Sequence, residues 1–161
     1  MGRTRITTLQ RIMKDIRTEL LKEAEKIKPE EYNWEPRPKM RTLKGQIQEI
    51  GSMEKICIHN LRTQQPLDWG KAIAWSGEDL VAHLKDLEGV RKETNQFLDS
   101  LRDDKELDKP HQLLPEWRQF WWNQESISSE EILRWVARHE YYHLGQIISY
   151  LWILGNNPYK P

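Results

Sequence analysis

The sequence predicts an all-α fold, a four-helix bundle with a long, tryptophan-rich connection before the last helix. Four segments of about 20 residues or more place apolar residues three and four positions apart, which is the repeat of an amphipathic helix. No segment alternates polar and apolar residues over the length of a strand. The 161 residues are enough for one hydrophobic core, so we expect residues 1–161 to form a single domain.

The first predicted helix covers residues 7–27, and Pro29 ends it because proline has no amide hydrogen to donate. Residues 32–40 include two prolines and form an extended connection. Thr42 is the expected N-cap of the second helix, because its hydroxyl can accept a backbone amide of the first turn. The apolar stripes of the two helices are Leu9, Ile12, Met13, Ile16, Leu20 and Ala24, and Leu43, Ile47, Ile50, Met53, Cys57 and Leu61.

The third predicted helix follows Ser76, and Glu78 and Asp79 lie in its first turn, where negative charge suits the helix dipole. The periodicity fails over residues 103–127, which we interpret as the long connection, with short strands or turns. Three of the eight tryptophans lie there, at positions 117, 121 and 122. We expect Trp117, Trp121 and Trp122 to cap the open end of the core, and an aromatic wall over a ligand pocket is the alternative.

Composition excludes several classes of partner. The 25 basic and 25 acidic residues give a formal net charge of zero, so we expect no nucleic-acid partner. No apolar run approaches the ~20 residues that cross a bilayer, and the first 20 residues do not resemble a signal peptide. The single cysteine, Cys57, has no intramolecular disulfide partner, which fits a reducing compartment. We therefore expect a cytoplasmic protein without a membrane partner.

The last predicted helix carries a pair of histidines. Ser128 or Ser129 is its expected N-cap, and residues 155–158 end it. His139 and His143 are four residues apart, so their rings leave the same helix face about 6 Å apart along the axis. Both lie within the apolar stripe, which predicts that they face the interior of the bundle. Two such imidazoles suit one divalent metal ion, and a metal-free polar network is the alternative.

The string HEYYH at residues 139–143 also satisfies the H-E-x-x-H pattern of zinc proteases, in which Glu140 would be the general base. Those enzymes take a third ligand from further along the chain. No Asp, Glu, His or Cys follows His143, so the sequence does not favour a protease. Glu140 lies on the shoulder of the stripe, and we interpret it as a solvated carboxylate, with a supporting or base role as the alternative.

A third ligand must therefore project from another helix. On the second helix, Glu49 lies at the edge of the apolar stripe and Glu54 lies nearer its centre, and the periodicity does not separate the two. His59, His83 and His111 are interpreted as surface or hydrogen-bonded histidines.

The segment HEYYHLGQI, residues 139–147, resembles the H-x-x-x-H-x-G-Q signature of DinB-like proteins, which are bacterial four-helix bundles with a metal site. Residues 32–55 are similar to that family's connection into its second helix, with W-x-P followed by R-[ST]-[LIV]. The resemblance implies a divalent metal, nickel or zinc, held by one histidine of the second helix and two of the last. It implies that His139 and His143 are ligands and that the second-helix position falls on Glu49.

Glu49 departs from the histidine of the family, and a carboxylate in its place also makes iron(II) or manganese acceptable. A His₂Glu set is a known catalytic zinc site with an open fourth position. Gln146 would orient a ligand or simply cap the polar patch, and we expect Gly145 to let a neighbouring helix approach the site.

The resemblance implies a metal-dependent enzyme that activates water or a low-molecular-weight thiol, of the hydrolase or thiol S-transferase type. Its partners would be a small-molecule substrate, in one version a thiol, and a second copy of the chain in a homodimer. The alternative is a non-catalytic helical-bundle interaction or stress protein with a degenerate metal site.

Overall fold

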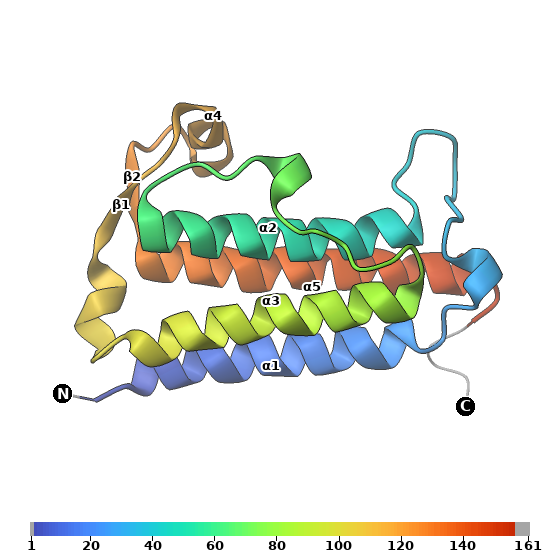
Figure 1. The fold of residues 1–161 in the computed structure, drawn as a ribbon, viewed down its shortest axis with the longest axis horizontal. Coiled ribbons are helices and arrows are strands. Elements are labelled where there is room, and N and C mark those ends of the chain that lie inside the picture. Colours follow the sequence, from blue (N-terminus) through green and yellow to red (C-terminus); the bar gives the residue numbers. More distant parts are fainter. Residues whose placement is uncertain (1, 157–161) are drawn as a thin grey trace.

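The computed structural model describes residues 2–156, and within them four long helices form the predicted bundle (Figure 1). The helices are α1 (Thr4–Ala24), α2 (Leu43–Thr63), α3 (Leu80–Ser100) and α5 (Ser129–Ile153). Helix α2 packs against α3 and α5, and α1 also packs against both, so α1 and α2 stand diagonally opposite. The two histidines and the second-helix carboxylate therefore lie on neighbouring helices, α5 and α2.

The long connection before α5 is confirmed, and it contains the expected short elements. These are a 3₁₀ turn (Asp104–Asp108), β1 (Pro110–Gln112), α4 (Pro115–Arg118), a second 3₁₀ turn (Gln119–Trp121) and β2 (Ser126–Ser128). Strands β1 and β2 pair antiparallel, with His111 opposite Ile127. Figure 1 shows this hairpin at one end of the bundle, with α4 beside it.

The predicted N-caps of two helices are confirmed. The hydroxyl of Thr42 accepts the amide of Gly45 at 2.9 Å, at the start of α2. Ser128 caps α5 in a capping box, because its hydroxyl accepts the amide of Glu131 while the Glu131 carboxylate accepts the amide of Ser128.

Three predicted helix boundaries differ from the structure. Helix α1 starts at Thr4 and ends at Ala24, three residues earlier at each end than predicted. Asp79 is the N-cap of α3 rather than a residue of its first turn, because its carboxylate accepts the amide of Ala82 at 2.8 Å. At the end of α5, Gly155 has the positive φ of a helix stop, and residues 157–158 of the predicted stop lie outside the described part of the chain.

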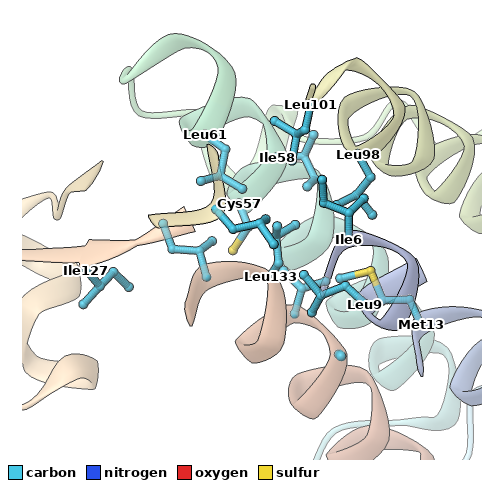
Figure 2. Close-up of a cluster of buried hydrophobic side chains, with 14 of the residues drawn as sticks. Ile6, Leu9, Met13, Cys57, Ile58, Leu61, Leu98, Leu101, Ile127 and Leu133 are labelled. Atoms are coloured by element: carbon cyan, nitrogen blue, oxygen red, sulfur yellow. The ribbon is translucent and has the colours of Figure 1, made fainter. Parts of the chain in front are cut away.

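The core consists of two clusters of buried apolar side chains. One lies toward the hairpin end, where Ile6, Leu9 and Met13 of α1 meet side chains from the other three helices (Figure 2). The second, at the other end, consists of Leu20, Ala24, Ile27, Tyr32, Leu43, Ile47, Ile50, Leu87, Leu144, Ile147, Tyr150 and Leu151. Among the helices described, none is long and apolar enough to cross a membrane.

A layer of four charged residues, the charged quartet, lies between the two clusters. The quartet consists of Arg17 of α1, Glu54 of α2, Arg91 of α3 and Glu140 of α5. Each is at most 8% exposed. The interpretation of Glu140 as a solvated carboxylate is therefore wrong: the residue is 1% exposed, and its carboxylate is paired with Arg17 of α1 and Arg91 of α3.

Hydrogen bonds join each arginine of the quartet to both glutamates. Glu54 accepts from Arg17 at 2.9 Å, from Arg91 at 2.7 Å and from the hydroxyl of Thr94 at 2.6 Å. Glu140 accepts from the same two guanidinium groups. Two positive and two negative charges cancel, so each buried ion is compensated, as burial away from water requires.

Glu54 makes the stability of the bundle depend on pH. Burial raises the pKa of this carboxyl, but Arg91 and Arg17 lower it by more, to about 2 from the ordinary 4.5. The stabilisation is therefore complete above pH 4.5 and is lost as the pH falls toward 2. Between pH 5 and pH 3, we expect urea unfolding to show the wild type losing on the order of 2 kcal/mol more than Glu54→Gln. Parallel stability profiles for the two proteins would contradict this.

The expectation for Gly145 is also wrong. A Cβ built on Gly145 meets no atom within 4 Å, so no neighbouring helix needs the glycine. The close approach occurs instead at Gly51 of α2, where a Cβ would lie 2.6 Å from Leu87 of α3 and 2.9 Å from the ring of Trp75.

Candidate metal centre

Helices α2 and α5 bring one carboxylate and two imidazoles together inside the bundle. One ligand atom each of Glu49, His139 and His143 lies within 4.8 Å of the other two. His143 is buried, and the side chains of His139 and Glu49 are 12% and 17% exposed. The structure thus unites the three residues that the sequence predicts to be metal ligands. It also separates Glu49 from Glu54, whose oxygens are bound to the charged quartet.

The distances within this group fit a metal ion. The Nε2 atoms of His139 and His143 are 3.1 Å apart, and the Nε2 atom of His139 is 3.9 Å from Oε1 of Glu49. Two ligands of a tetrahedral zinc ion, each about 2.1 Å from it, lie about 3.4 Å apart. The donor atoms therefore already stand close to the spacing that a bound ion imposes, and the donor chemistry of two imidazoles and a carboxylate suits it.

Gln46 orients the imidazole of His143, a role that sequence reasoning missed. The side-chain carbonyl of Gln46 accepts a hydrogen bond from Nδ1 of His143, and its amide nitrogen lies 3.4 Å from the hydroxyl of Tyr150. Because Nδ1 carries the proton, Nε2 presents a lone pair toward His139. A carbonyl on the far nitrogen is the usual support of a metal-binding histidine. The sequence position of Gln46 could have indicated this role, because Gln46 precedes Glu49 by three residues and lies on the same face of the helix.

The environment of His143 keeps its ring neutral. Burial, and after it the neighbouring His139, lower the pKa of His143 from 6.5 to about 4. The neutral imidazole is the form that binds a metal ion. His143 is therefore ready to bind at any pH near neutrality.

Glu49 is held in its ionised form. Burial raises the pKa of its carboxyl, but the neighbouring His139 and the charge of Arg41 outweigh this, and the net pKa lies below the ordinary value. The guanidinium of Arg41 is 2.8 Å from Oε2 of Glu49, which leaves Oε1 directed at His139. Arg41 thus fixes the carboxylate with one oxygen free for the site.

The other two predicted site residues, Glu140 and Gln146, have different hydrogen-bond partners. Glu140 is absent from the candidate metal-ligand group, and both of its oxygens accept from arginines, so its base role stays a prediction. Gln146 donates to the hydroxyl of Tyr142 at 3.0 Å. Its buried Oε1 has no hydrogen-bond partner in the described part of the chain. The Gln146 side chain acts to raise the pKa of His143, against the net lowering by burial and His139. The orienting role of Gln146 therefore also stays a prediction.

Two of the remaining histidines are hydrogen-bonded, as predicted. His83 is buried and lies 2.6 Å from the hydroxyl of Tyr32 and 2.9 Å from the carbonyl of Gly77. His111 contacts Gln64 and the hydroxyl of Ser129. His59 lies half-buried on the flank of α2.

A cavity of about 280 Å³ adjoins the candidate metal centre, and Glu49 and His139 form part of its wall. The long connection covers it. Trp121 belongs to the apolar core, as expected, and it also lines the cavity. Whether that cavity is a ligand pocket stays a prediction. Trp117 lines the cavity as well, whereas Trp122 is 80% exposed and does not cap the core.

Comparison with known proteins gives two findings. The family model of the DinB superfamily matches residues 13–147. A crystal structure of a DinB-like protein from Bacillus subtilis superposes with a TM-score of 0.66 over 92% of each chain, at 14% sequence identity. At that identity the superposition supports the all-α fold. No curated protein matches.

Proposed function

The chain belongs to the DinB superfamily, and from this premise we propose that it binds a divalent metal ion through His139, His143 and Glu49. The observation that carries the proposal is the His143 ring, which Gln46 fixes with its Nε2 lone pair facing the other two groups. The two imidazole nitrogens and the carboxylate suit zinc or nickel, and the carboxylate also accepts iron(II) or manganese.

We propose further that the loaded protein is an enzyme of the hydrolase or thiol S-transferase type. Lewis acidity at an open coordination position, which lowers the pKa of a bound water or thiol, is the chemistry that such an ion supplies. Within the chain, Gln46 orients one ligand, Arg41 offsets the charge of Glu49, and the aromatic connection lines the adjoining cavity. That two copies of the chain form a homodimer stays a prediction. Light scattering tests it by measuring the molar mass of the protein in solution.

One observation favours the non-catalytic alternative. The ion pair with Arg41 gives Glu49 a counter-charge without any metal. In that case the two histidines and Glu49 form a metal-free polar network inside a structural bundle.

Metal titration of the full chain tests the proposal. After chelation and dialysis, we expect calorimetry to show one Zn²⁺ or Ni²⁺ bound per chain. Binding to the folded state alone adds about 2.7 kcal/mol of stability at a free metal concentration of 100 Kd, so the melting temperature must rise. Hydrolysis of a neutral ester, or addition of a thiol to an electrophile, should appear with the metal and vanish with chelator. An absence of saturable binding would leave the non-catalytic alternative.

A further inference from the structure

The cavity beside the candidate metal centre has an aromatic wall. Trp117, Phe120 and Trp121 of the long connection line it from one side, and Trp135 of α5 lines it beside the centre. The rings form a continuous series: Trp121 and Trp135 have centroids 5.9 Å apart, and Trp135 stacks on His139 with centroids 4.9 Å apart and planes at 24°. A flat molecule in the cavity would therefore lie against aromatic side chains up to the histidine.

The rest of the cavity wall is apolar or neutral except at the centre itself. Met53 and Cys57 contribute sulfur atoms, and burial raises the pKa of the Cys57 thiol, which stays protonated. No lysine or arginine is among the lining residues. The single carboxylate is Glu49, at the edge that it shares with His139. Away from the candidate metal centre, a substrate carboxylate or phosphate would thus find no counter-charge in the cavity wall.

We propose that the substrate is a small, neutral molecule with a flat apolar group, seated among these rings with its polar reacting group at Glu49 and His139. The placement of the reacting group rests on the proposed function, whereas the apolar seat does not. The volume of about 280 Å³ is large enough for a group of one or two fused rings. Peptide-like thiols, with ammonium and carboxylate groups, fit poorly, because burying an unpaired charge is costly.

The apolar seat is tested on chelated full-length protein, with circular dichroism confirming that it remains folded. The probes are 2-naphthol and 2-naphthoate, which share a ring system and differ in charge at pH 7. We expect calorimetry to show one saturable site for 2-naphthol, with at least tenfold weaker binding of 2-naphthoate. Phe120→Ala and Trp117→Ala should each weaken 2-naphthol binding at least fivefold.

Trp122→Ala is the matched control, because this exposed tryptophan belongs to the same connection but does not line the cavity. We expect it to change the affinity for 2-naphthol less than twofold. Phe120 is 67% exposed, so its replacement leaves the core intact and keeps the test valid if Trp117→Ala does not fold. Equal affinity for the two naphthalenes, or equal effects of Phe120→Ala and Trp122→Ala, would overturn the proposal.

A second arm uses zinc-loaded protein with benzohydroxamate and acetohydroxamate, which carry the same chelating group. We expect the phenyl compound to bind at least tenfold more tightly, and Phe120→Ala to reduce that preference. Equal binding of the two compounds would overturn the proposed orientation in the cavity. If 2-naphthol binds but zinc does not, the proposed function fails and the apolar seat stands. If zinc binds but 2-naphthol does not, the apolar seat fails alone.

Discussion

Replacing His143 with alanine is expected to lower the affinity for Zn²⁺ at least 100-fold, as measured by calorimetry against a chelating indicator. The change removes one of three donor atoms, and it also removes the ring that Gln46 holds in place. The two remaining donors, on different helices, no longer surround an ion. His139→Ala and Glu49→Ala should weaken binding in the same way, since each removes one of the three.

Gln46→Leu gives a finer test of the same site. It leaves all three donor atoms in place but removes the carbonyl that fixes the His143 ring, and the loss of such support costs 10–100-fold in metal affinity in other proteins. His59→Ala is the control, because it removes a histidine of α2 that lies outside the group. If His59→Ala weakens zinc binding as much as His143→Ala, the ion binds elsewhere.

The fold was predictable because each long helix repeats its apolar residues at the helical period over about five turns. The N-caps Thr42 and Ser128 were predictable because a cap is a local interaction. Each hydroxyl accepts a hydrogen bond from a backbone amide three residues later, and this does not depend on packing against other helices. The start of α3 was misplaced because Asp79 suits an N-cap as well as a first turn. Only its hydrogen bond to the amide of Ala82 distinguishes the two.

The candidate site was predictable in part. The sequence shows that His139 and His143 are four residues apart on the apolar stripe of one helix. Helix geometry therefore predicted that the two imidazoles lie close together inside the bundle. Helix geometry did not decide whether Glu49 or Glu54 joins the two histidines. That depends on which side chains the neighbouring helices place opposite each carboxylate. Glu54 meets Arg91 across the α2–α3 contact, and no periodicity of α2 contains that information.

The charged quartet carried a signal that periodicity analysis overlooked. Arg17 lies four residues after Met13 and three before Leu20, so a charged residue interrupts the apolar line of α1. Glu140 stands likewise between Val136 and Leu144 on α5. A charge on a buried line implies a buried partner, although the sequence does not identify it.

The quartet leads to the second large expected effect, the destabilisation of Arg91→Met. The change leaves Glu54 and Glu140 buried with one guanidinium between them, and breaking a buried ion pair by removing one partner costs about 3–5 kcal/mol. We expect urea unfolding to show a loss of that size, a large part of the ~5–15 kcal/mol that stabilises a domain. Lys92→Met is the matched control, because this neighbouring cation of α3 is exposed and its loss should stay within about 0.5 kcal/mol.

The double variant Arg91→Met/Glu140→Gln separates the loss of charge balance from the loss of packing. Removing one residue of each sign keeps the buried layer neutral, with Arg17 and Glu54 still paired at 2.9 Å. If unpaired charge dominates the cost, the double variant is more stable than the sum of the single variants predicts, by at least 1 kcal/mol of coupling. If the two effects simply add, the residues act as independent packing elements. In that case the four helices are not held in register by their charges.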